Sequence, residues 1–430
     1  MLAFARSLSS IAIMVTCLTR PMSTSRAARC CHVHRRDLLR SAATALPMVV
    51  AGRAYAAPRA GSRLLVVFLR GAYDAANIVA PTGADFYHQA RSTIGLSRPD
   101  PLDAAAPLPL DADWSLHPAL RDSIPPVWGL RQLAFIPFAG TDDLSRSHFE
   151  TQDTIELGQP VGGHRDDGSG LMARLATILG RDDRPIAFTD QLPLCFHGGV
   201  DPVSNLAPAN IGKPIDAHMA GPITAMYQDD PLLRGAVAKG FQVRDTVYQA
   251  LQGEMATASR GAVSAQGFEL SARRIGTVMR DRFSLAFVDV GGWDTHVDQG
   301  GATGYLADRI AELGRGLAGF VDAIGPAAWR TTTVVVVSEF GRTFRENGDR
   351  GTDHGHGSVY WVMGGGLSGG RMAGEQVALS EATLNQQRDL PVLTDYRVLI
   401  GGLVQRQFGL SEARIASLFP QAWPQDLHLI

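Results

Sequence analysis

The sequence predicts an α/β fold with a mostly parallel central sheet flanked by helices. Several short apolar runs lack both polar alternation and helical periodicity, which is typical of strands buried on both faces of a sheet. An amphipathic helical pattern over 307–324 separates the runs 283–290 and 331–337, and this strand, helix, strand order indicates a βαβ unit with parallel strands. Acidic residues follow the ends of several runs, where open α/β sheets place their chemistry.

Composition limits the function classes. The chain has 430 residues, 45% of them hydrophobic, and a formal net charge of −2. This is enough apolar material for a large core, and the charge gives no electrostatic reason to expect a nucleic-acid partner. The Pro-, Asp- and Ala-rich stretch 85–126 is interpreted as a long surface excursion. Since no linker divides residues 57–430 clearly, we expect one elaborated α/β domain there, although it exceeds the usual domain size.

The first 56 residues resemble an export signal. A twin-arginine pattern, Arg35-Arg36-Asp37-Leu38-Leu39-Arg40, precedes the apolar stretch 41–50 and the small-residue cleavage site Ala54-Tyr55-Ala56. We predict a Tat signal peptide with an overlong leader over residues 1–56, export by the Tat translocase, and a periplasmic or secreted location. The alternative is a basic amphipathic helix of the mature protein. The apolar stretch is too short to span a bilayer, so no stable membrane span is expected after cleavage.

Cysteine usage excludes an internal disulfide after cleavage. Three of the four cysteines lie in the first 56 residues, which leaves Cys195 alone. Cys195 and the nearby His197 form a candidate nucleophile pair, but a lone cysteine in an apolar stretch is more typical of a core residue.

The stretch that begins with the run 331–337 carries the densest candidate chemistry. Glu339 lies at the end of this run, and Asp353, His354 and His356 lie in a Gly- and Asp-rich loop before the next apolar run. Carboxylates and imidazoles held between two strands are, in outline, a metal site or an acid/base site.

Two further strand ends carry the same residue types. Asp74 follows the apolar run 63–69, and Asp294 and His296 follow the run 283–290. A doubly wound sheet brings such strand ends to one edge, so we expect these side chains to converge. Their donors suit zinc, manganese, magnesium or iron better than copper, and we predict one or two divalent ions, of zinc, manganese or magnesium. The predicted ligands are Asp74, Asp294, His296, Glu339, Asp353, His354 and His356.

The loop 141–150 is a candidate position for a nucleophile. It places two hydroxyls, an arginine and a histidine close together after the apolar run 133–138. The alternative is that its serines and aspartates only form turns and helix caps.

Four segments resemble the bacterial family known as domain of unknown function 1501, whose members often carry Tat signals. The segments are LLVVFLRGAYDAAN, SRSHFETQD, FVDVGGWDTH and VVVVSEFGRTFRENGDRGTDHGHGS. The resemblance spans the mature chain, and the SEFGRT to DHGHG segment is its most specific part. The family in turn resembles the alkaline phosphatase superfamily, with its sulfatases and cofactor-independent phosphoglycerate mutases. Those enzymes hold two metals at the strand tips of an α/β sheet, with a Ser, Thr or formylglycine nucleophile between them.

The resemblance implies roles for the predicted ligands. They are a first-strand ligand at Asp74, a later pair at Asp294 and His296, a strand-end carboxylate at Glu339, and a late histidine at His354 or His356. The sequence departs from the superfamily pattern at two points. The pair is spaced Asp-x-His instead of Asp-x-x-x-His, and Phe340 follows Glu339 where the superfamily has a histidine, which removes a nitrogen ligand unless Asp353-His354 supplies it.

The resemblance also implies a hydrolytic mechanism. Ser147 is the preferred nucleophile, with Ser145 as the second choice, and a divalent metal would lower the pKa of its hydroxyl or of a water. Arg146 or Arg342 would neutralise the oxygens of the transferred group. For Arg342 the alternative is a structural salt bridge to Glu339 or Asp349.

We therefore expect an exported metal-dependent hydrolase that acts on a small phosphate or sulfate ester. The alternative is a non-catalytic periplasmic binding or assembly protein with a degenerate phosphatase-like site, which acts on or with cell-surface polysaccharide.

Overall fold

The computed structural model describes residues 61–162, 165–180, 185–199, 203–206, 217–230, 233–242 and 267–430. All of them belong to the unit Ala56–Ile430. The predicted signal peptide, residues 1–56, lies outside the described residues, and one domain over 57–430 stays a prediction. No helix among the described residues combines the length and the apolar character needed to cross a membrane.

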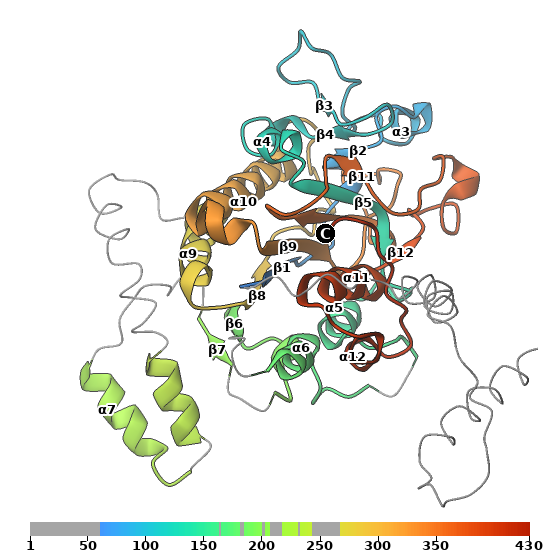
Figure 1. Cartoon of the computed structure of the whole chain (residues 1–430). Helices are drawn as coiled ribbons and strands as arrows, with labels where there is room; N and C mark the ends of the chain where they lie inside the picture. Colours follow the sequence, from blue (N-terminus) through green and yellow to red (C-terminus); the bar gives the residue numbers. More distant parts are fainter. Residues whose placement is uncertain are drawn as a thin grey trace, which may run out of the picture. The chain divides into compact units, whose positions relative to one another are not determined.

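The centre of the fold is a nine-stranded, mostly parallel sheet (Figure 1), which confirms the predicted fold class. Five neighbouring strands run parallel to one another. In spatial order they are β9 (Thr332–Ser338), β1 (Arg63–Leu69), β8 (Leu285–Val290), β6 (Pro185–Phe188) and β7 (Ser204–Asn205).

One antiparallel strand joins this parallel part to the other side of the sheet. β10 (Ser358–Met363) is antiparallel to β9 and to β5 (Leu133–Gly140). The two-residue strands β11 (Arg371–Met372) and β12 (Thr394–Asp395) run parallel to β5. As a result, β5 ends at the same edge of the sheet as β1, β8 and β9.

Helices cover both faces of the sheet, because the central strands are apolar on both sides. Along β1, Leu65 and Val67 belong to one apolar cluster, while Leu64 and Val66 belong to the other. Full burial of each such side chain contributes roughly 1.5–3 kcal/mol. This explains why the apolar runs show no polar alternation.

The first cluster lies under α9 (Phe268–Asp281) and α10 (Tyr305–Trp329). Helix α10 connects β8 to β9, so the predicted βαβ unit is confirmed, and the helix is interrupted at Gly325, whose φ is 76°. The second cluster lies under α6 (Leu171–Leu179), α11 (Tyr396–Phe408) and α12 (Glu412–Leu418), together with Ile155 of α5 (His148–Leu157).

The stretch interpreted as a surface excursion contributes to the core instead. Trp114, Leu120 and Ile124 are buried in the first cluster, so the surface interpretation of 85–126 is wrong for these residues. A small sheet forms here, with the strands β2 (Val79–Ala80), β4 (Ser115–Leu116) and β3 (Leu108–Pro109). The short helices here are η1 (Ala75–Asn77), α3 (Asp85–Ala90), η2 (Pro118–Leu120) and α4 (Pro125–Gly129).

Three further elements lie elsewhere in the described part of the chain. They are η3 (Leu194–Phe196), α7 (Ala217–Met226) and η5 (Glu381–Thr383). Cys195 lies in η3, and burial raises the pKa of its thiol well above the ordinary value. This supports the interpretation of Cys195 as a core residue and not as a nucleophile.

The register of the central strands brings their ends together. Leu69 of β1 lies opposite Val290 of β8 and Ser338 of β9. The loops that follow these three strands therefore leave the sheet side by side, as expected for the carboxyl edge of a parallel sheet.

Candidate metal centre

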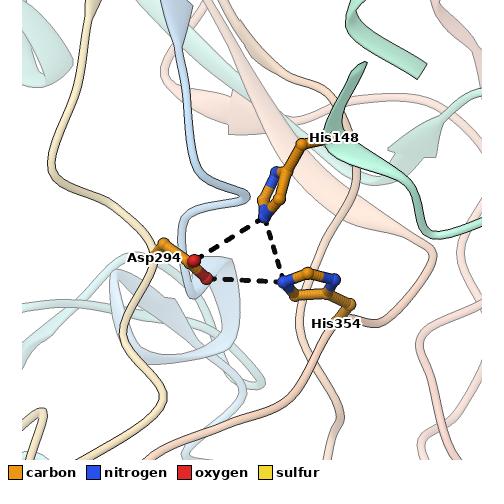
Figure 2. A group of neighbouring side chains, drawn as sticks. All are labelled: His148, Asp294 and His354. Atoms are coloured by element: carbon orange, nitrogen blue, oxygen red, sulfur yellow. Dashed lines mark hydrogen bonds and ion pairs between the residues drawn. The ribbon is translucent and has the colours of Figure 1, made fainter. Parts of the chain in front are cut away.

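Two imidazoles and a carboxylate converge at this carboxyl edge. One ligand atom each from His148, Asp294 and His354 lies within 4.8 Å of the others. The Nε2 atoms of His148 and His354 are 3.0 Å apart, and Asp294 lies 3.4 Å from His354 Nε2 and 3.8 Å from His148 Nε2. Figure 2 shows the two rings and the carboxylate pointing toward one another. Such a nitrogen and oxygen donor set suits zinc.

Three different segments supply these side chains. His148 is the first residue of α5, Asp294 lies in the loop after β8, and His354 lies in the loop between β9 and β10. The last loop folds back on itself, since the Gly355 amide donates to the Gly341 carbonyl at 2.8 Å. A Cβ atom at Gly355 would lie 2.4 Å from the Arg342 backbone, so this close approach requires glycine.

A third imidazole, that of His296, borders the group. Its Nε2 atom is 3.1 Å from His354 Nε2 and 2.9 Å from Asp294 Oδ1. His296 is more exposed than the other two rings, with 39% of its side chain accessible against 22% for His148 and 27% for His354. The side chain of Asp294 is 48% accessible, so the group opens to solvent.

The Nδ1 atom of each ring faces an acceptor. His148 Nδ1 lies 2.7 Å from Glu339 Oε1, His354 Nδ1 lies 3.1 Å from the Arg146 carbonyl, and His296 Nδ1 lies 3.4 Å from Asp353 Oδ1. A neutral imidazole that donates through Nδ1 carries its lone pair on Nε2. With this tautomer the Nε2 lone pairs of His148 and His354 face each other beside a carboxylate, while His296 Nε2 also faces the Arg342 guanidinium at 3.4 Å. A cation shared by the rings would offset this repulsion. Orienting partners behind each ring are typical of metal-binding histidines.

Arg342 supports the group from behind. Its side chain is fully buried and forms an ion pair with Asp294 at 2.5 Å. Its other N–H groups donate to backbone carbonyls of three loops, at Gly71, Ala72, Trp293 and Thr352. The salt-bridge partner is thus Asp294, and the predicted partners Glu339 and Asp349 are wrong. Since its donors are engaged within the protein, Arg342 fixes the loops and holds Asp294.

The electrostatics set the protonation states of the group. Burial raises the pKa of Asp294, but the hydrogen bond and charge of Arg342 outweigh it and hold this pKa below its usual value. Burial lowers the pKa of His354, and the nearby His148 and Arg342 lower it further. An ionised carboxylate and a neutral imidazole are the states in which these side chains bind metals.

Glu339 lies behind His148 and not among the converging atoms. It is fully buried, and its Oε1 accepts from His148 Nδ1, Gln152 Nε2 and the Gly71 amide at 2.7 to 2.8 Å. Burial alone raises the pKa of Glu339, yet these hydrogen bonds hold it below the usual value. In this geometry Glu339 orients a histidine, so its predicted position among the ligands is corrected.

Asp74 is not brought to the group. Its carboxylate is buried and receives both terminal nitrogens of Arg91, at 2.5 and 2.9 Å, and Gln299 Nε2 at 2.7 Å. A buried carboxylate with three such donors is satisfied by the protein itself. Asp74 therefore ties β1 to the segment after α3, and its predicted place among converging ligands is corrected.

The two remaining predicted ligands also lie outside the converging atoms. Asp353 is exposed and faces His296, and a hydrogen bond from Asn347 lowers the pKa of its carboxyl. His356 is buried near Asp389, Arg146 and Asp143, and burial lowers its pKa. Of the two histidines in this loop, only His354 reaches the group.

The loop predicted to hold the nucleophile places its residues differently. Ser147 directly precedes His148 and does not cap α5 with its hydroxyl, so its role as a nucleophile stays a prediction. The guanidinium of Arg146 binds the buried Asp389 at 2.7 Å and Gln386 at 2.8 Å. Arg146 meets the group through its carbonyl, which accepts from His354, and its backbone is left-handed with a φ of 54°.

Sequence reasoning did not assign His148 and Gln152 to the site. On this loop the predicted site residues were Ser145, Arg146 and Ser147, although His148, Gln152 and Glu156 recur at intervals of four. On a helix this spacing forms one polar face. A polar row on a helix that must also pack against the sheet is the sequence signal that could have assigned His148 and Gln152 to the site.

Comparison with known proteins gives one family match. Residues 200–419, just over half of the chain, match the family described as "Protein of unknown function (DUF1501)". This range includes Asp294 and His354 but not His148. None of the curated proteins compared with the chain matches it.

Two solved structures show distant likeness. A protein in the alkaline phosphatase superfamily from Vibrio parahaemolyticus is 11% identical, with a TM-score of 0.31, over 70% of this chain and 60% of that chain, which is less than two thirds of its length. A second structure, described as Ps i-CgsB in complex with k-i-k-neocarrahexaose, is 8% identical, with a TM-score of 0.34, over 85% of this chain and 75% of that chain. At TM-scores this low, neither likeness assigns an activity or a site residue to this chain.

Proposed function

The chain belongs to the DUF1501 family, whose description assigns no activity, and we propose that it is an exported metal-dependent hydrolase of a phosphate or sulfate ester. The geometry of its own residues supports the metal dependence, the twin-arginine pattern supports the export, and the resemblance to the alkaline phosphatase superfamily suggests the ester. The observation that carries this proposal is the convergence of His148, Asp294 and His354 at the carboxyl edge of the sheet. Neutral imidazoles, an ionised carboxylate and an open side are what a catalytic site for a divalent ion requires.

The ligands would be His148 and His354 through Nε2 and Asp294 through its carboxylate, with His296 as a neighbouring fourth donor. Zinc or manganese suits this donor set. A bound divalent ion would supply Lewis acidity to the ester oxygens and lower the pKa of the attacking hydroxyl or water.

The chain's own residues would perform the remaining steps. His296 is the most exposed of the three imidazoles. When the other three ligands hold the ion and His296 does not bind it, its Nε2 would exchange a proton with the leaving group. Ser147 lies next to His148 and remains the candidate nucleophile, with water as the other. Arg342 keeps Asp294 ionised and aimed at the two rings.

One observation favours the second candidate, a non-catalytic binding protein. The guanidinium groups of Arg146 and Arg342 are engaged by Asp389 and Asp294. Neither arginine is therefore in a position to neutralise the oxygens of a transferred phosphoryl or sulfuryl group, a task that such enzymes commonly give to cations.

The test is ester hydrolysis by the full chain, stripped with a chelator and then reloaded with zinc, manganese or magnesium. We expect hydrolysis of an aryl phosphate or an aryl sulfate that depends on the metal and disappears in His354→Ala. His428→Ala is the matched control, because His428 is a surface histidine with 80% of its side chain exposed. Equal hydrolysis with and without metal would overturn the proposed mechanism. Metal binding without hydrolysis of either ester would support the binding protein.

Export is tested separately from catalysis. Replacement of Arg35 and Arg36 by lysine should retain the protein in the cytoplasm, because the Tat translocase reads the paired arginines. Unchanged export of this variant would contradict the Tat assignment, and fractionation of cells that express both forms provides the measurement.

A further inference from the structure

Helix α5 carries a row of polar side chains on the face that meets the strand ends. His148, Gln152 and Glu156 are four residues apart, so they lie one above another along the helix. Glu156 is only 4% exposed, which is unusual for a carboxylate unless a partner is present. All three side chains hydrogen-bond to residues just after the ends of β1 or β9.

Arg70 connects this row to the sheet. Its Nε donates to Asp289 Oδ2 at 2.7 Å, its Nη2 to Glu156 Oε1 at 2.7 Å, and its Nη1 to Gln152 Oε1 at 2.8 Å. A guanidinium only donates hydrogen bonds, so the Gln152 atom that faces Arg70 must be the amide oxygen. The orientation of the Gln152 amide therefore follows from its neighbour and is not arbitrary.

The orientation of Gln152 passes to His148 through Glu339. Gln152 Nε2 and the Gly71 amide both donate to Glu339 Oε1, at 2.8 Å each. Since Oε1 acts as an acceptor, its third neighbour, His148 Nδ1 at 2.7 Å, must donate to it as well. The proton of the neutral ring is then on Nδ1, and the lone pair of Nε2 faces His354 and Asp294.

We propose that Arg70 and Gln152 are positioning residues, which act through Glu339 to fix the tautomer and the ring orientation of His148 and so keep its Nε2 available for a divalent cation. This inference rests on the proposed function in one respect, because the metal is what the available Nε2 atom would bind. The tautomer itself is a property of the metal-free chain. Residues that orient a metal-binding histidine in this way typically contribute about 10- to 100-fold to metal affinity.

The first measurement is the imidazole 15N NMR spectrum of the metal-free full chain near neutral pH, with the His148 signals assigned through His148→Ala. We expect the neutral form of the His148 ring to carry its proton on Nδ1. A wild-type His148 with its proton on Nε2 would overturn the inference, whether or not the chain binds a metal.

The second measurement compares Gln152→Met with the wild type. Methionine has a similar length but makes neither hydrogen bond of the amide. We expect a mixture of His148 tautomers in the metal-free variant and zinc affinity reduced by about 10- to 100-fold, measured by competition with a chelating dye. Gln387→Met is the matched control, because Gln387 is exposed, and it should change neither quantity. An unchanged tautomer and an unchanged zinc affinity in Gln152→Met would overturn the inference.

A second variant covers the case in which Gln152→Met does not fold. Arg70→Lys keeps the charge between Asp289 and Glu156, but one ammonium does not reproduce the fork that also fixes Gln152. It should shift the tautomer in the same direction by a smaller amount, and a wild-type spectrum would overturn the inference. A wild type with the Nδ1 tautomer that binds no zinc would refute the proposed function and leave the positioning inference standing.

Discussion

Asp74 and Asp294 lie at comparable places, each a few residues beyond the end of one of two neighbouring parallel strands, yet their surroundings differ. Both carboxylates form an ion pair with a fully buried arginine. The side chain of Asp74 is 1% exposed and receives three side-chain donors, whereas that of Asp294 is 48% exposed and faces imidazoles. A position at a strand end therefore does not by itself make a carboxylate a ligand. The groups that face the carboxylate oxygens decide whether the side chain stabilises the fold, as Asp74 does, or faces a candidate metal group, as Asp294 does.

The largest effect is expected from Asp74→Ala. This change leaves the guanidinium of Arg91 buried without its carboxylate, and removal of one partner of a buried ion pair costs about 3–5 kcal/mol. Urea unfolding of the metal-free chain measures the loss. The control is Asp85→Ala, because the Arg98–Asp85 pair is largely exposed and such pairs contribute about 1 kcal/mol or less. Similar losses for both variants would contradict the structural role of Asp74.

Asp294→Asn should have the opposite profile to Asp74→Ala, with a small loss of stability and a large loss of zinc affinity. The amide oxygen keeps a hydrogen bond from Arg342, so the free energy of unfolding should fall far less than in Asp74→Ala. Zinc affinity should fall by about 100-fold or more, because loss of a direct ligand costs at least as much as loss of a supporting partner. Competition with a chelating dye measures this. Wild-type zinc affinity in Asp294→Asn would remove the distinction between the two aspartates.

Asp353→Ala tests whether His296 belongs to the metal group. Asp353 faces His296 Nδ1 at 3.4 Å and is exposed, so its loss should reduce zinc affinity by about tenfold, the lower end for a supporting partner. Asp349→Ala is the control, since Asp349 is exposed in the same loop. Equal affinities in the two variants would place His296 outside the group.

The smallest expected effect is on the pH dependence of stability, and it comes from His117, a buried histidine outside the metal group. His117 Nδ1 accepts from the Ala119 amide at 3.0 Å, and its Nε2 faces the Gly301 carbonyl at 2.9 Å. This arrangement needs the neutral ring, and burial lowers the pKa of His117. The unfolded chain therefore binds the proton more readily, so stability is present above the ordinary histidine pKa of about 6.5 and declines as the pH falls toward the folded value.

Between about pH 7 and pH 6 this decline amounts to less than about 1 kcal/mol. His117→Gln should remove that part of the pH dependence, which urea unfolding at the two pH values measures. A pH dependence identical to that of the wild type would show that another group is responsible.

The fold was predictable because its central strands are buried on both faces. Runs such as 331–337 need no polar alternation, and the helix between 283–290 and 331–337 makes these two strands run in the same direction, on either side of β1. The edge at which Asp294 and His354 meet follows from that topology. These steps depend on local pattern and on chain order, which a single sequence contains.

The rest of the site depends on partners that are distant in the sequence. Arg91 binds Asp74 from a stretch interpreted as surface, and His148 reaches Glu339 from α5, the helix after β5, which lies beyond an antiparallel strand. No spacing between these residues signals the contacts. The sequence therefore predicted the residue types and the edge of the sheet, but not which carboxylates bind arginine and which face imidazoles.

The most direct test of the central claim is the metal content of the full chain, purified without chelator and analysed by mass spectrometry beside His148→Ala and Asp74→Asn. The account predicts about one equivalent of a divalent metal per folded chain, lost in His148→Ala and retained by the Asp74→Asn protein that folds. A folded wild type without metal, or metal that survives His148→Ala and disappears with Asp74→Asn, would contradict it.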